Sequence, residues 1–178
     1  MRETVITHSL TKMYEDFCPV SELEMRVREG SIYGFLGPNG AGKSTTLKML
    51  LGLAHPTSGS IEILGQEMNG KYRMAILRQV GSLIESPSYY GHLTARENLR
   101  ICTTILGLPE KNIDAVLKIV RLDRQEGKKT SAYSLGMKQR LAIAQAIMEK
   151  PDVILLDEPT NSLDEDGVAL IRSLILEE

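Results

Sequence analysis

The sequence predicts an α/β fold with a mostly parallel sheet, and three observations support this prediction. Short apolar strands alternate along the chain with amphipathic helices, an order typical of parallel sheets with helical crossovers. A glycine-rich turn at residues 37–44 lies between a predicted strand and a predicted helix. The segment 152–157 has a continuous apolar middle, which is typical of a central parallel strand covered on both faces.

Length and composition exclude several classes of protein. A length of 178 residues is typical of one domain. The hydrophobic fraction of 42% and the charged fraction of 25% are ordinary for a globular protein and exclude a disordered or fibrous chain. A net charge of −2 and an aromatic content of 4% argue against a nucleic-acid partner. Two distant cysteines and three scattered histidines indicate reduced thiols and no zinc site. No apolar run reaches the ~20 residues of a membrane helix, and the first four residues do not begin a signal peptide.

The first part of the chain predicts strands around one helix. The helix is expected over 44–53, where Leu47, Leu50 and Leu51 share one face. The predicted strands cover residues 4–10, 31–36, 60–64 and 80–84.

The middle of the chain predicts helices. Residues 94–97 form a capping-box pattern, in which Thr94 and Glu97 each satisfy a free N–H group, and a helix is expected to follow to about Gly107. A second helix begins after Pro109, with apolar residues at helical spacing at positions 113, 116, 117 and 120. We therefore predict one domain, 1–178, in which an α-helical lobe over 88–150 is inserted into a core lobe formed by 1–87 and 151–178. A last helix is expected over 165–178.

Residues 37–44 fit the phosphate-loop pattern G-x-x-x-x-G-K-[ST] in its required place between a strand and a helix. The glycines allow backbone N–H groups to line an anion nest, and the helix N-terminus adds its positive dipole end. Lys43 can reach the β- and γ-phosphates, and the Ser44 hydroxyl can ligate Mg²⁺. The alternative is a chance glycine turn. The motif predicts a P-loop NTPase core whose nucleotide-binding residues are Gly37, Pro38, Asn39, Gly40, Ala41, Gly42, Lys43, Ser44 and Thr45.

Two acids follow the predicted strand at 152–157. Ligands bind at the carboxyl ends of parallel strands, so Asp157 is expected in the Mg²⁺ shell. Glu158 is one residue further and is expected to orient the attacking water or to act as its general base. The alternative is an acidic cap where the strand meets a loop.

With both motifs in place, the chain resembles the ATP-binding subunit of an ABC transporter over nearly its whole length. Residues 133–140 lie where that family has its LSGGQ-type signature; Ser134 and Gly136 agree with it, whereas Tyr133, Leu135 and Met137 depart from it. The D-loop of the family is matched by Asn161, Ser162, Leu163 and Asp164. Tyr14 matches the aromatic residue that stacks on adenine, with an ordinary tyrosine at a strand edge as the alternative. The resemblance implies the ABC ATPase fold, with an antiparallel β edge and the inserted α-helical lobe.

The resemblance also implies cofactors and partners. ATP and Mg²⁺ are the implied cofactors, with no other metal and no nucleic acid. The signature is expected to open a helix and to contact the ATP of a second ATP-binding subunit, so that two copies enclose two nucleotides head to tail. The implied contact residues are Ser134, Leu135, Gly136 and Met137. A membrane-spanning permease subunit is the other implied partner, which places the chain in the cytoplasm, peripheral on the inner face of the cell membrane.

Two departures from the family narrow the interpretation. Glu85 stands where most members have the glutamine of the Q-loop, which resembles the ATPases of bacitracin-resistance and lantibiotic-immunity exporters. Glu85 is therefore implied as a catalytic residue and as a metal ligand beside Ser44 and Asp157, the alternative being that it faces solvent. Residues 85–92 resemble the groove that receives a coupling helix from the permease.

The second departure is the absence of the switch histidine, which in the family follows the last helix and contacts the γ-phosphate. The last histidine of this sequence is His92, well before that position. We expect a C-terminally truncated ABC ATPase or one with impaired hydrolysis. The predicted function is ATP hydrolysis that drives export of a peptide antibiotic. The alternatives are a non-hydrolysing nucleotide-binding fragment and a soluble ABC ATPase that acts on nucleic acid or ribosomes.

Overall fold

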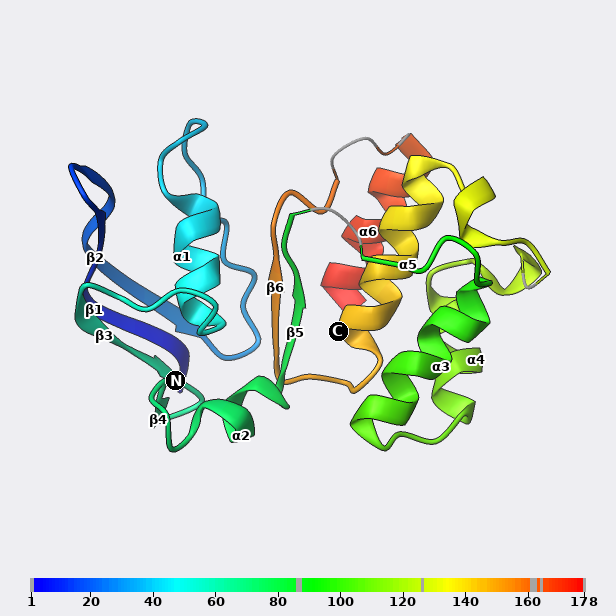
Figure 1. The fold of residues 1–178 in the computed structure, drawn as a ribbon, viewed down its shortest axis with the longest axis horizontal. Coiled ribbons are helices and arrows are strands. Elements are labelled where there is room, and N and C mark those ends of the chain that lie inside the picture. Colours follow the sequence, from blue (N-terminus) through cyan, green and yellow to red (C-terminus); the bar gives the residue numbers. More distant parts are fainter. Residues whose placement is uncertain (1, 86–87, 126, 161–162, 164, 178) are drawn as a thin grey trace. The chain divides into compact units, whose positions relative to one another are not determined.

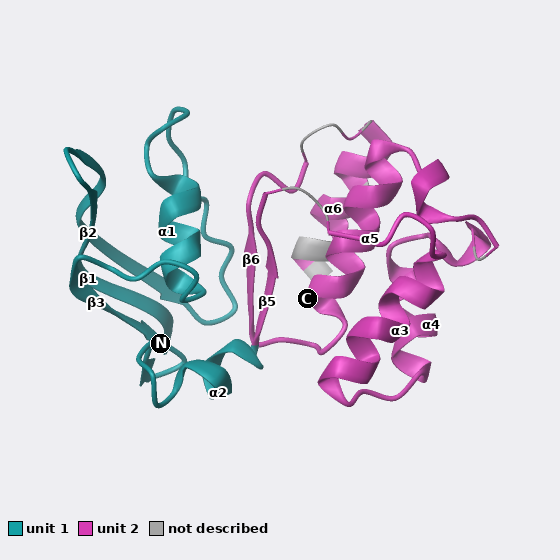
Figure 2. Ribbon diagram, viewed as in Figure 1, with its two compact units in different colours: residues 1–79 teal, residues 80–178 magenta. Residues whose placement is uncertain are grey.

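The computed structural model describes residues 2–85, 88–125, 127–160, 163 and 165–177 (Figure 1). The chain divides into two compact units, residues 1–79 and residues 80–178 (Figure 2). The predicted division into a core lobe and a helical lobe at 88–150 stays a prediction.

Unit 1 is built on a four-stranded antiparallel sheet with the strand order β2-β1-β3-β4. Its elements are β1 (Glu3–Tyr14), β2 (Phe17–Arg28), α1 (Lys43–Leu50), β3 (Ser58–Ile63), β4 (Gln66–Glu67) and α2 (Arg73–Leu77). Val5 of β1 pairs with Val27 on one side and with Ile63 on the other, so β1 is an inner strand. Val5 and Ile63 are buried, as are Met49 and Leu50 of α1. This sheet is the antiparallel part that the resemblance implies.

Most of the predicted elements of unit 1 are confirmed. β1 covers the segment predicted at 4–10, and β3 covers all but the last residue of the segment predicted at 60–64. The helix predicted at 44–53 is α1, which ends three residues earlier than predicted. β2 was not predicted from the sequence, because apolar and polar residues alternate clearly only in its second half. The strand predicted over 31–36 is wrong: the segment is not a strand, and Ile32 and Leu36 are 63% and 92% exposed. An apolar run forms a strand only where a neighbouring strand satisfies its N–H and C=O groups, and no strand described in unit 1 pairs with this one.

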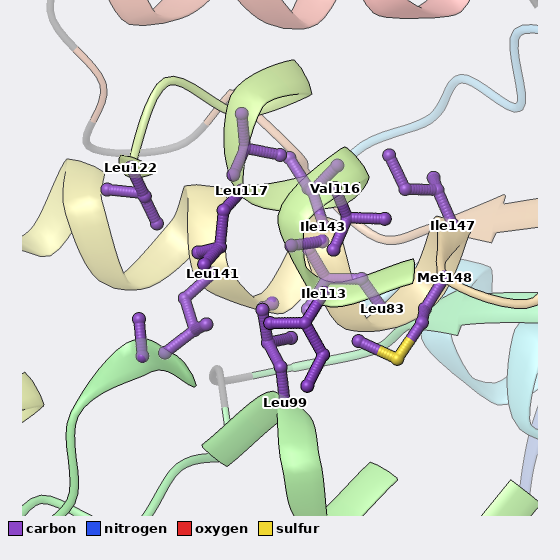
Figure 3. Packing of buried hydrophobic residues seen from close by; sticks show 14 of the residues in the cluster. Leu83, Leu99, Ile113, Val116, Leu117, Leu122, Leu141, Ile143, Ile147 and Met148 are labelled. Atoms are coloured by element: carbon purple, nitrogen blue, oxygen red, sulfur yellow. The ribbon is translucent and has the colours of Figure 1, made fainter. Parts of the chain in front are cut away.

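Unit 2 combines a parallel pair of strands with four α-helices. β5 (Val80–Leu83) pairs with β6 (Val153–Leu156), and Leu83 is the partner of Leu156. The helices are α3 (Ala95–Leu106), α4 (Lys111–Ile119), α5 (Leu135–Ile147) and α6 (Glu165–Glu177), and short 3₁₀ turns cover Asp123–Gln125 and Thr130–Ala132. Leu99, Ile113, Leu117 and Leu141 lie in one buried apolar cluster shared by α3, α4 and α5 (Figure 3).

Local signals in unit 2 are confirmed in detail. Thr94 Oγ1 accepts a hydrogen bond from the Glu97 N–H at 3.2 Å, and Glu97 Oε2 accepts one from the Thr94 N–H at 2.7 Å. Gly107 ends α3 with a φ of +69°. The four apolar positions predicted for the next helix are all buried. The strand predicted at 152–157 is β6, in which Leu155 is buried and the other three residues are half-buried, so it is less enclosed than its apolar run predicts. Among the described helices, none has the length and hydropathy needed to cross a lipid bilayer.

Candidate functional site

The phosphate loop leads directly into the first turn of α1. Gly42 is the N-cap residue of this helix and has a φ of +82°, a left-handed conformation that favours glycine. It is buried, and a side chain at this position would overlap the carbonyl group of Pro19 and approach Val20 Cγ2 to 2.9 Å. Only glycine therefore fits between β2 and the start of α1.

Lys43 extends over the loop that precedes it. Its Nζ donates hydrogen bonds to the carbonyl oxygens of Gly37 at 2.8 Å and Pro38 at 2.9 Å. The backbone N–H and Oγ1 of Thr46 both bond to the Gly42 carbonyl, at 2.8 and 2.9 Å, which begins the helix. The first N–H groups of a helix have no acceptor within it and lie at its positive end. The loop residues 37–41 are exposed and Ser44 and Thr45 are half-buried, so the surroundings fit an anionic ligand such as a triphosphate.

Tyr14 lies at the end of β1, where it pairs with Phe17 of β2. It is 47% exposed, and Lys12 Nζ lies 4.7 Å from the centre of its ring. The same strand β2 also lies against the phosphate loop: Pro19, two residues after Phe17, contacts Gly42. The predicted base-stacking residue and the predicted phosphate-binding residues thus belong to one unit.

The predicted carboxylates lie together at the edge where β5 and β6 end. Asp157 donates its backbone N–H to the Leu83 carbonyl at 2.8 Å, which extends the parallel ladder. Leu83 and Leu156 are paired across the two strands. Glu85 lies two residues after Leu83 and has a φ of +62°, and Glu158 lies two residues after Leu156 and has a φ of +47°. The two glutamates therefore hold equivalent positions just beyond the ends of adjacent strands, and both have a left-handed conformation that is uncommon for residues other than glycine.

The donor chemistry of these residues suits Mg²⁺. The ion takes oxygen ligands and is usually held by one or two carboxylates together with water and phosphate oxygens. Within unit 2, Glu85 and Asp157 supply two carboxylates, and Ser44 of unit 1 supplies a hydroxyl. That the three ligate one ion stays a prediction. No three His, Cys, Asp or Glu side chains in the described part of the chain gather into a ligand cluster, and a phosphate-assisted Mg²⁺ site does not require such a cluster.

The signature segment opens a helix, as expected from the resemblance. Ser134 is the N-cap residue of α5, and its Oγ accepts a hydrogen bond from the Met137 N–H at 3.3 Å. Leu135 is 53% exposed in the first turn, whereas Met137 packs against the apolar cluster. A side chain at Gly136 would lie 3.3 Å from Leu163 Cδ2, which brings the signature beside the predicted D-loop. The other D-loop residues, Asn161, Ser162 and Asp164, lie outside the described residues.

Two further side chains explain how the signature helix is held. Tyr133 is buried, which raises the pKa of its phenol, and its hydroxyl donates to the Gln125 carbonyl at 3.3 Å. Tyr133, which departs from the family pattern, thus places its ring in the buried apolar cluster. Gln139 is also buried, and its Nε2 donates to the Pro159 carbonyl at 3.3 Å, next to Glu158. No role for Gln139 followed from the sequence, because its partner is a backbone atom 20 residues away.

An open groove of about 550 Å³ lies beside the segment predicted to receive a coupling helix. Asn98 is buried and holds one wall: it accepts from the Tyr90 N–H at 2.7 Å and donates to the carbonyls of Tyr90 and Thr94 at 3.2 and 2.9 Å. Burial raises the pKa of the Cys102 thiol in the same lining. The groove is lined by Ser88, Tyr89, Tyr90, Asn98, Ile101, Cys102 and Gln145.

Comparison with known families gives the same result as the motifs. The family model described as "ABC transporter" matches residues 20–161. The chain belongs to the ABC transporter family. Among its relatives, the bacitracin transport ATP-binding protein BcrA of Bacillus licheniformis is 51% identical over 176 residues, which are 98% of this ABC transporter chain and 57% of that protein. The lantibiotic transport ATP-binding protein SrtF of Streptococcus pyogenes is 41% identical over 167 residues, 94% of this chain and 71% of that protein.

Solved structures show the same fold. An ATP-binding subunit of an ABC transporter has a TM-score of 0.84 and 30% identity, covering 98% of this chain and 74% of that one. The protein cbiO1 of Clostridium perfringens, part of the ABC transporter complex cbiONQ, has a TM-score of 0.86 and 28% identity, covering 99% of this chain and 74% of that one. The chain spans a little over half the length of several of the curated relatives it matches, including BcrA at 57%.

Proposed function

We propose that this ABC transporter chain binds and hydrolyses Mg-ATP, and that hydrolysis drives export of a peptide antibiotic of the bacitracin or lantibiotic type. The observation that carries the proposal is the buried, left-handed Gly42, which brings the start of α1 and the Lys43 ammonium to one anion-binding turn. The names of the relatives in Bacillus and Streptococcus refer to transport of bacitracin and of a lantibiotic, which supports the antibiotic part of the proposal.

The residues of the loop bind and orient the triphosphate. Lys43 exchanges its hydrogen bonds to the Gly37 and Pro38 carbonyls for bonds to the β- and γ-phosphates, while the N–H groups at the start of α1 bind the same oxygens. Tyr14 stacks on the base. Mg²⁺, when bound, would neutralise phosphate charge, and Ser44, Asp157 and Glu85 are the residues that would hold it.

Glu158 positions the water that attacks the γ-phosphorus. The water oxygen forms a bond to phosphorus, the bond from phosphorus to the bridging oxygen of ADP breaks, and the proton passes to the Glu158 carboxylate. ADP and inorganic phosphate are the products. The carboxylate lies on an exposed turn just after β6, where water reaches it.

Two partners complete the proposed assembly. A second ATP-binding subunit supplies Ser134, Leu135, Gly136 and Met137 to the nucleotide, since the N-terminus of α5 is exposed and carries free N–H groups. A membrane-spanning permease subunit docks a coupling helix in the groove beside Tyr89 and Tyr90. The chain then lies in the cytoplasm, on the inner face of the cell membrane.

Phosphate release and thermal unfolding test the proposal together. The parent chain should release phosphate from Mg-ATP faster than the Glu158→Gln variant, and ATP should raise the melting temperature of both, because ligand at 100 times Kd stabilises a protein by about 2.7 kcal/mol. The Lys43→Ala variant should lose this rise. An unchanged rise in Lys43→Ala would contradict the phosphate site. Binding without turnover by the parent chain would favour a non-hydrolysing nucleotide-binding fragment.

A further inference from the structure

The end of β1 is fastened to the segment that connects α1 to β3. The Thr57 N–H donates to the Thr11 carbonyl at 2.8 Å, and the Met13 N–H donates to Thr57 Oγ1 at 2.9 Å. Lys12 adds a bond from its side chain, because its Nζ donates to the His55 carbonyl at 2.7 Å. Three consecutive residues before Tyr14 are therefore fixed to a second part of unit 1.

The same Lys12 ammonium lies over the ring of Tyr14. Its Nζ is 4.7 Å from the ring centre, inside the ~6 Å range of a cation–π interaction. The bond to the His55 carbonyl restricts where the ammonium sits, so the ring meets a cation whose position is fixed. Tyr14 is nevertheless 47% exposed, which leaves ring surface for a further contact.

This arrangement affects how the ring stacks. A cation over one face attracts the π electrons of the ring toward that face. The opposite face is then poorer in electron density and stacks better on an electron-rich purine. The cation also limits rotation of the tyrosine side chain, so less conformational entropy is lost when a base binds.

We propose that Lys12 is a positioning residue for the nucleotide base: anchored on the His55 carbonyl, it holds the Tyr14 ring ready for stacking. The inference rests on the proposed ATP site and adds to it a residue that acts through Tyr14 and not on the phosphates. Lys43, by contrast, is bonded to carbonyls of the phosphate loop itself.

Calorimetric titration of the full 178-residue chain with two ligands tests this role. Mg-ATP has a base and Mg-tripolyphosphate has none. Lys12→Met should weaken Mg-ATP binding about two- to five-fold, the fold-change that corresponds to an exposed cation–π interaction, and should leave tripolyphosphate binding unchanged. Lys12→Arg should retain ATP affinity, because a guanidinium also stacks over tyrosine.

A matched control comes from unit 1 itself. Lys71 Nζ also lies 4.7 Å from the ring centre of a tyrosine, Tyr72. Lys71→Met therefore makes the same chemical change at the same distance, and it should leave both affinities unchanged.

The Tyr14→Ala background decides whether Lys12 acts through the ring. If it does, adding Lys12→Met to Tyr14→Ala should weaken ATP binding no further. An equal loss of ATP and tripolyphosphate affinity, an unchanged ATP affinity, or a loss that persists without Tyr14 would each overturn the inference. ATP binding that is retained in the parent and lost in Lys43→Ala, together with an inert Lys12→Met, would overturn the role of Lys12 alone. A parent chain that bound neither ligand would overturn the proposed function and this inference with it.

Discussion

Two glycines of the phosphate loop offer a test of what the buried turn requires. Gly40 and Gly42 have the same φ of +82°, so alanine at either position meets the same backbone strain, about 1–2 kcal/mol. Their surroundings differ. A Cβ on Gly40 would meet no atom within 4 Å, whereas a Cβ on Gly42 would overlap the Pro19 carbonyl and approach Val20. Backbone atoms yield less readily than the end of a side chain, and overpacking of this kind costs about 1–3 kcal/mol.

We therefore expect Gly40→Ala to lower the free energy of unfolding by about 1–2 kcal/mol and Gly42→Ala to lower it by about 2–5 kcal/mol. Urea titrations followed by circular dichroism measure both values under one set of conditions. Gly42→Ala should also lose the ATP-induced rise in melting temperature, because β2 and the start of α1 must move apart. A difference between the variants below about 0.5 kcal/mol, which is the usual scatter of surface substitutions, would refute the steric argument.

Three other substitutions test the proposed metal ligand Glu85, the N-cap of α5 and the capping box of α3. Glu85→Gln should raise the Mg²⁺ concentration needed for half-maximal phosphate release, because it removes a charged ligand; an unchanged requirement would place Glu85 away from the metal. Ser134→Ala should lower the free energy of unfolding by about 1 kcal/mol through loss of the N-cap bond to Met137, and should weaken ATP-driven dimerisation in gel filtration. The Thr94 N–H and hydroxyl lower the pKa of Glu97, so the stabilisation by this carboxylate is complete above the ordinary glutamate pKa and is lost as the pH falls through the lower folded value. Glu97→Gln should remove this loss of stability below about pH 5, which urea midpoints measured against pH would show.

Features specified by neighbouring residues were predictable from the sequence. The capping box of α3 needs only Thr94 and Glu97 three residues apart, and both of its hydrogen bonds are present. The conformation of the phosphate loop is likewise specified by its own residues, since Gly42 adopts a left-handed conformation that few other residues accept. The helical spacing in α4 predicted its buried face because one face of a helix must meet a core whatever lies opposite.

Features that depend on distant partners were not predictable in the same way. Residues 31–36 have the apolar composition of a strand, but composition does not supply a neighbour for their backbone groups. Lys12 lies two residues before Tyr14, and its second contact, the His55 carbonyl, is 43 residues away. Gln139 is buried on a carbonyl that becomes its neighbour only when α5 packs beside the end of β6. Such contacts follow from packing, which a linear pattern does not describe.

Glu85 and Glu158 hold matched backbone positions, which bears on the roles proposed for these two glutamates. A left-handed conformation costs a residue other than glycine about 1–2 kcal/mol, and glycine or asparagine would relieve it. Two adjacent parallel strands each end in this conformation, two residues after the paired Leu83 and Leu156, and each has a glutamate there. Both side chains are charged and both lie on exposed backbone after the strand ends. A positive φ by itself assigns no role, because six other residues besides glycine share it: Ser9, Glu15, Glu22, Leu64, Arg121 and Lys150. What sets Glu85 and Glu158 apart is their matched place at the carboxyl edge of β5 and β6, the edge at which parallel sheets bind ligands and at which the proposed hydrolysis needs its carboxylates.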